Sequence, residues 1–133
     1  MALISPHEGQ QKFLEYMCNF GVPTNMKMYL FKNNIVPTHL TTLSDMTPCV
    51  NPTDYDGPIT LTGGSWTVGL SGGVMQAMYG QQTFTFAAET TVYGQYITDN
   101  TSTYILMIDR FDNGPYLVPP TGVVKVTPTF IMS

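Results

Sequence analysis

The stretch from Thr91 to Asp99 constrains the fold more than any other part of the chain. It reads Thr-Val-Tyr-Gly-Gln-Tyr-Ile-Thr-Asp, and its β-branched and aromatic residues fit the pleated, half-buried surface of a β-strand. Gly94 interrupts the run, and a glycine inside a strand marks a bulge or the close approach of another backbone. Asp99-Asn100 has the chemistry of a turn, and a second apolar run follows from Tyr104 to Asp109. The sequence therefore predicts a central hairpin on which the other strands assemble.

Short runs of the same kind occupy most of the remaining chain. The further predicted strands are Met26 to Phe31, Ile59 to Thr62, Trp66 to Leu70, Val74 to Tyr79, Thr83 to Ala87, Tyr116 to Val118 and Gly122 to Met132. Gly63-Gly64 and Gly72-Gly73 are interpreted as hairpin turns, and Pro128 predicts an edge strand or a kink. Many short strands separated by turn residues predict a mainly β fold, an antiparallel β-sandwich that is jelly-roll-like or barrel-like.

Two other segments complete a single predicted domain over residues 1–133. Ser5-Pro6-His7-Glu8 has the pattern of a helix start, and apolar residues at helical spacing predict an N-terminal α-helix over about residues 6–20. Residues 35–57 contain several prolines among Thr, Ser, Asn and Asp, which predicts an unusually long loop. Long loops of this kind have a function or are fixed by a partner.

The charge content separates this chain from ordinary soluble domains. Only 11% of the residues are charged, against roughly 25% in a typical domain. The formal net charge is −4 and the five basic residues are scattered, so we expect no nucleic-acid partner. No apolar run reaches the roughly 20 residues of a membrane span, and the N-terminus lacks the regions of a signal peptide. We therefore expect a cytoplasmic origin, no membrane partner and a protein that works within an assembly.

The sequence gives little indication of a metal site or of functional cysteines. Cys18 and Cys49 are interpreted as reduced, buried apolar residues, and only His7 and His39 would remain as further zinc ligands. Asp54 and Asp56 lack the further oxygen ligands of a calcium loop and are interpreted as turn residues. No cofactor is expected.

The remaining candidates for chemistry are a carboxylate cluster and a set of tyrosines. Asp109 and Asp112 flank Arg110, which fits either a glycosidase-like or sugar-binding cluster or, as we prefer, an arginine paired with neighbouring carboxylates. The tyrosines that could line a contact face are Tyr79, Tyr93, Tyr96, Tyr104 and Tyr116. We assign no catalytic, cofactor-binding or metal-binding residue, and we predict that the chain is not an enzyme.

Several short segments, taken in order, resemble small virion structural proteins of tailed bacteriophages, including cyanophages. They are Leu30-Phe31-Lys32-Asn33-Asn34 with Val36-Pro37-Thr38, Leu61 to Trp66, Gln81 to Phe86, Val92-Tyr93-Gly94-Gln95-Tyr96, Arg110-Phe111 with Gly114-Pro115-Tyr116, and Val124 to Pro128. The chain has Tyr93-Gly94-Gln95-Tyr96 where the family often has Tyr-Gly-Tyr.

The resemblance implies a virion component that decorates or cements the capsid, with no catalytic residues to transfer. The expected partners are the major capsid protein and further copies of the chain, a trimer being one option. The expected location is the virion, assembled in the host cytoplasm. The loop over residues 35–57 and the extreme N-terminus are the predicted contacts. The alternatives are a tail, fibre or head-spike module that binds a host glycan or a tail protein and, more remotely, a small glycan-degrading enzyme.

Overall fold

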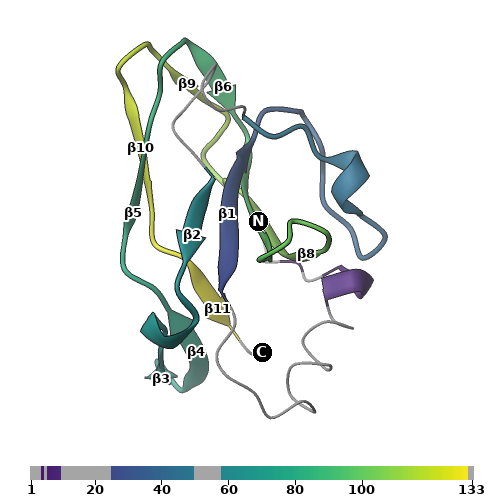
Figure 1. The fold of residues 1–133 in the computed structure, drawn as a ribbon, viewed down its shortest axis with the longest axis vertical. Helices are drawn as coiled ribbons and strands as arrows, with labels where there is room; N and C mark the ends of the chain where they lie inside the picture. The colour runs from purple at the N-terminus through teal and green to yellow at the C-terminus, as the bar shows by residue number, and fades with distance from the viewer. Residues whose placement is uncertain (1–3, 5, 10–24, 50–57, 132–133) are drawn as a thin grey trace.

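The computed structural model describes residues 4, 6–9, 25–49 and 58–131, and these form mainly β-structure (Figure 1). The strands are β1 (Met26–Phe31), β2 (Ile59–Leu61), β3 (Thr67–Ser71), β4 (Val74–Met78), β5 (Gln82–Thr85), β6 (Thr90–Val92), β7 (Gly94–Asp99), β8 (Ile105–Arg110), β9 (Tyr116–Val118), β10 (Val123–Val126) and β11 (Thr129–Ile131). Their pairings are antiparallel. The predicted fold class, an antiparallel sandwich-like β fold with a short N-terminal helix, is confirmed.

The predicted central hairpin is confirmed as the pair β7 and β8. Tyr96 lies opposite Ile108, and a bulge between Ile97 and Thr98 shifts the register. The Asp99 carboxylate closes the turn, because its Oδ1 accepts the amides of residues 103 and 104 at 2.8 and 2.7 Å. β1 pairs with the other side of β7, and β2 pairs with β1, so the strand order is β2-β1-β7-β8.

Both faces of this four-stranded sheet are buried. Met28, Leu30 and Ile97 point into a first core. The other buried members of this core are Cys49, Leu61, Phe84, Phe86, Val92, Val118 and Val126. The opposite face carries a second core of Phe31, Met46, Tyr96, Ile105 and Ile108. The chain that follows β1 returns to cover this second face.

The segment that covers this second face is the described part of the predicted long loop. Met46 is buried there, and Ile35 and Leu43 pack beside it, with residues Leu43–Asp45 forming the 3-10 turn η1. Backbone hydrogen bonds join Lys32 N to Thr47 O and Cys49 N to Leu30 O, each at 2.9 Å. Residues 35–49 are therefore bound to the edge and face of the sheet. The rest of the predicted loop, residues 50–57, lies outside the described residues.

A second layer lies against the first core and is built from one long, bent ribbon (Figure 1). Val126 pairs with Gln82, whereas Thr129 pairs with Met78, so the register shifts by one residue where β10 continues into β11. Pro128 lies at this shift, and its carbonyl accepts the Tyr79 amide at 2.9 Å. The kink predicted at Pro128 is confirmed. β3 joins the free side of β4 and gives the order β11-β4-β3.

The two glycine pairs, Gly63-Gly64 and Gly72-Gly73, lie in different kinds of turn. Gly72 and Gly73 have positive φ angles of 58° and 81° and connect β3 to β4, so this predicted hairpin turn is confirmed. Gly63 and Gly64 belong to the 3-10 turn η2 (Gly63–Ser65). Because β2 pairs with β1 and β3 pairs with β4, the hairpin predicted at the first pair is wrong.

The N-terminal segment covers the outer edge of β8. Ile4 and Ile108 exchange two backbone hydrogen bonds of 3.1 and 2.9 Å. The Glu8 carboxylate accepts the amide of Ile105 at 3.0 Å, and Gly9 lies directly against the backbone of residues 105–106. Residues 7–9 are helical, and residues 10–20 of the predicted helix lie outside the described part of the chain.

Candidate functional site

The predicted cluster around Arg110 is divided between the two faces of β8. Asp109 lies opposite Gln95 and borders a small internal space with Ile97 and Met107, on the side of the first core. Arg110 points to the other face. Adjacent residues in a strand alternate between faces, so an Asp-Arg pair in sequence is separated once the strand forms. Strand alternation alone could have revealed this separation from the sequence.

Asp109 occupies a half-buried position with an incomplete set of hydrogen bonds around it. Burial raises the pKa of Asp109 above its ordinary value, and a hydrogen bond from the Gln95 side chain opposes the increase only in part. Gln95 is buried, and its Oε1 has no hydrogen-bond partner among the described residues. The arrangement is an internal acid–amide pair between strands and does not expose a second carboxylate for acid–base chemistry.

Arg110 has a structural role in holding the covering segment. Its Nη1 donates to the carbonyl oxygen of Ile35 at 2.8 Å, and its guanidinium lies 5.3 Å from the centre of the Tyr93 ring. These contacts fix the point at which the chain leaves β1. Asp112 is exposed in the connection between β8 and β9. Two members of the candidate cluster, Asp109 and Arg110, thus lie on opposite faces of β8.

The five tyrosines do not gather on one face. Tyr96 is buried and stacks on Tyr29 with ring centres 5.0 Å apart, whereas Tyr93 borders the second core. Tyr79 packs edge-on against Trp66 at 5.2 Å. Tyr104 and Tyr116 remain exposed, on the β7–β8 turn and on β9. One of the five is therefore buried, two pack at the border of a core and two are exposed.

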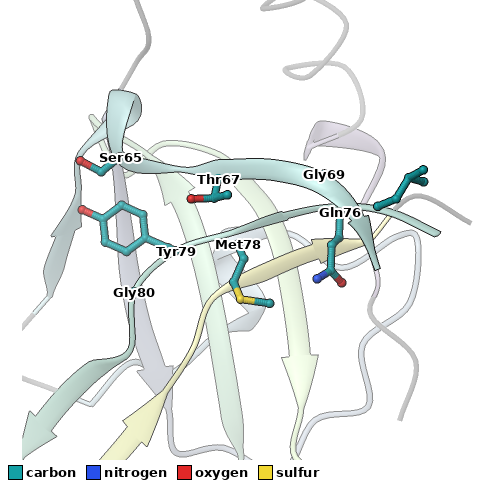
Figure 2. A pocket seen from close by; sticks show the side chains of 8 residues that line it. Ser65, Thr67, Gly69, Gln76, Met78, Tyr79 and Gly80 are labelled. Carbon is teal, nitrogen blue, oxygen red and sulfur yellow. The ribbon is translucent and has the colours of Figure 1, made fainter. Parts of the chain in front are cut away.

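A groove of about 400 Å³ lies along the β3–β4 hairpin. Its lining residues are Ser65, Thr67, Gly69, Leu70, Gln76, Met78, Tyr79 and Gly80. Figure 2 shows the Gln76 and Met78 side chains pointing away from the hairpin on the same side, with Tyr79 at the end near Ser65. The Tyr79 hydroxyl oxygen accepts the amide of Thr62 at 2.9 Å. The groove offers apolar contact and neutral hydrogen-bonding groups, and its lining residues carry no charge.

Sequence reasoning missed the distribution of charge between the two layers. No Asp, Glu, Lys, Arg or His occurs from residue 57 to residue 88, and Lys125 alone is charged from residue 113 to residue 131. These ranges contain β3, β4, β5, β9, β10 and β11, which we call the neutral layer, together with β2 of the four-stranded sheet. Exposed apolar side chains within them are Leu70, Met78, Tyr116, Leu117, Val123 and Ile131. The spacing of charges in the sequence is the signal that could have revealed this neutral layer.

The remaining candidates are the two cysteines, the two histidines and the pair Asp54 and Asp56. Cys49 is buried in the first core, as predicted, whereas Cys18, Asp54 and Asp56 lie outside the described residues. His7 is exposed and stacks on His39 with ring centres 5.7 Å apart. Among the described residues, no group of three metal-ligating side chains converges, and no helix there is long and apolar enough to cross a membrane.

The site and fold thus define a mainly β, sandwich-like protein with one largely neutral layer. Comparison with protein-family models, with curated proteins and with solved structures gives no significant match.

Proposed function

We propose that this chain is a non-enzymatic structural protein of a tailed-phage particle that decorates and cements the capsid shell. The supporting observation is the neutral layer, since residues 57–88 carry no charge, residues 113–131 carry one, and the described parts of these two ranges together expose six large apolar side chains. A surface without charges suits lasting contact with neighbouring subunits, because burying an unpaired charge is costly. The resemblance to small virion proteins supports the same class of function.

The proposed mechanism is mechanical. Copies bind where capsomers meet and bury surface that the bare shell leaves exposed. Because the bound form exists only on the assembled shell, binding shifts the equilibrium away from disassembly by mass action. The partners are the major capsid protein and neighbouring copies of the chain, within the virion.

The shell contact is assigned to the loop that begins at Ile35. The side chains of Val36 and Leu40 are 61% and 79% exposed. The residues that follow them, Pro37 and Thr41, are buried and hold the loop backbone in place. Thr41 also accepts the Thr38 amide at 2.9 Å. Apolar side chains on an already ordered loop bind with little further loss of conformational entropy.

The alternative, a tail, fibre or head-spike module that binds a glycan or a tail protein, has less support. It rests on the tyrosines and on the cluster of Asp109, Arg110 and Asp112. In this cluster, Asp109 and Arg110 point to opposite faces of β8. Neither set provides a continuous face in the described part of the chain.

Copy number and position on purified particles test the function. We expect the protein to be present in proportion to the major capsid protein and to lie over the capsid, as measured by quantitative mass spectrometry and by electron microscopy with an antibody label. A few copies at the tail or at one vertex would support the alternative. Absence from the particle would rule out both.

A pair of matched variants tests the contact. Leu40→Asp places a charge on the loop, and Asn100→Asp places the same charge at an exposed position in the β7–β8 turn, outside both the loop and the neutral layer. We expect Leu40→Asp to lower the number of copies retained on particles, whereas Asn100→Asp should bind like the wild type. Equal retention of both variants would contradict the loop contact while leaving the virion location intact.

A further inference from the structure

The edge formed by β3 lacks the protection found at the edges of β8 and β10. The N-terminal segment covers β8, and β10 carries Lys125 with Pro128 close behind. β3 contains neither a charge nor a proline, and Leu70 on it is 72% exposed. Among the described strands that pair on one side only, β3 is the longest without a covering segment. Natural proteins block such an edge unless another strand is meant to pair with it.

The β3–β4 turn determines which backbone groups of β3 are available. Ser71 and Val74 flank a two-residue turn, so they form a hydrogen-bonded pair, and the pairs at residues 69/76 and 67/78 follow the same pattern. The intervening residues, Val68 and Leu70, direct their N–H and C=O groups away from β4. They provide two donors and two acceptors along the outer edge.

Gly69 lies between these two residues and has no explanation within one copy of the chain. A Cβ at this position would meet nothing within 4 Å, and its φ angle lies outside the left-handed region where glycine is favoured. Glycine weakens a strand interior, and it is found where another backbone approaches closely. A backbone that approached Gly69 closely would therefore belong to another molecule.

We propose that β3 pairs antiparallel with β3 of a second copy, around a two-fold axis that passes through Gly69. In this register Val68 of one copy pairs with Leu70 of the other, and all the outward N–H and C=O groups of these residues are satisfied. Gly69 then faces its own equivalent in a non-hydrogen-bonded pair, where Cα atoms come within about 4.5 Å. The result is one continuous sheet, β11-β4-β3-β3-β4-β11, across two copies.

The charge pattern favours a second copy as the occupant. Burying an unpaired charge is costly, so an uncharged edge pairs best with an uncharged, extended strand, and β3 itself meets both conditions. Pairing two identical strands in this register brings no like charges together. A two-fold contact of this kind uses the same patch on both subunits and closes at two copies. The inference does not depend on the virion role, because it concerns the purified chain alone.

The test measures the mass of the purified full chain by sedimentation equilibrium over a range of concentrations. We expect a concentration-dependent dimer of the 14.7 kDa chain. Leu70→Pro removes an outward N–H while sparing the ladder with β4, and it should weaken the dimer at least tenfold. Leu70→Lys should weaken it similarly, whereas Leu117→Lys, the same change at a leucine that is 64% exposed, should not.

Amide hydrogen exchange keeps the proposal testable if a variant folds poorly. In the wild type, the Val68 and Leu70 amides should exchange more slowly as concentration rises, while the amide of Thr83 in β5 serves as the reference. A monomer at every concentration, a closed trimer, or exchange at Val68 and Leu70 that is independent of concentration would overturn the proposal.

Discussion

Gly94 lies on β7 where both neighbouring strands, β1 and β8, approach closely. A Cβ there would collide with the carbonyl oxygen of Asp109 on β8 and would lie 2.6 Å from Cε1 of Phe31 on β1. Phe31 is fully buried, so its ring has little room to move. The glycine noticed in the sequence is therefore required by a close approach from both neighbouring strands. The interpretation of Gly94 as a close-approach position is confirmed.

Gly94→Ala should destabilise the fold by roughly 2–3 kcal/mol, because the added methyl group must displace backbone or a buried ring. Gly80→Ala is the matched control, since a Cβ at residue 80 would meet nothing within 4 Å and its φ angle is not in the left-handed region. Urea unfolding followed by circular dichroism measures both. Equal stability of the two variants would show that β1 and β8 can separate at Gly94 without cost.

Asp109 gives a pH dependence whose sign follows from its position. Its pKa is raised by burial in the folded chain, so the folded state binds the proton more tightly than the unfolded state. The contribution of Asp109 to the free energy of unfolding is therefore most favourable in acid. It is lost as the pH rises from the ordinary value of 3.8 through the raised folded pKa.

Asp109→Asn should therefore raise the melting temperature at pH 7 and have little effect in acid, near pH 3. The amide is neutral and can also donate to the unpartnered Oε1 of Gln95. Glu89→Gln removes the same charge at an exposed position and should change the melting temperature much less. Calorimetry at both pH values measures these melting temperatures. A melting temperature for Asp109→Asn below that of the wild type at pH 7 would contradict the prediction that the ionised carboxylate destabilises the fold.

At the scale of elements, the segment from Ile35 to Cys49 serves as a cover for the sheet. It buries Met46 against the second core, and η1 and the hydrogen bond from Arg110 to Ile35 hold it in place. Its exposed and buried residues have different roles. The buried ones stabilise the protein, and the exposed ones remain available for a partner.

Met46→Ala should lower the free energy of unfolding by about 2–3 kcal/mol, since it removes most of a side chain that is only 7% exposed. Leu40→Ala truncates an exposed side chain of the same segment and should have almost no effect on stability. Denaturant titrations of the two variants give the comparison. If both are as stable as the wild type, the segment does not contribute to the core.

For the whole molecule, the main feature is the contrast between its two layers. The four-stranded sheet is covered on both faces and has charged residues in its strands, whereas the opposing ribbon and the β3–β4 hairpin are almost neutral. A neutral layer with an unprotected edge is a liability for a monomer in solution. It is an advantage for a protein whose neighbours cover that layer, which links the proposed self-pairing to the proposed role on the shell.

The sequence by itself determined the local structure. Alternating β-branched and aromatic residues with glycine and asparagine turns were sufficient for the central hairpin, the Gly72-Gly73 turn and the kink at Pro128, because hydrogen-bond ladders and turns depend on neighbouring residues. The tertiary structure decided how separate segments meet. It placed residues 35–49 over the second face of the sheet and Arg110 on the Ile35 carbonyl, and it left β3 as an open edge. These contacts join residues distant in the sequence, and no local pattern encodes which buried surfaces come together.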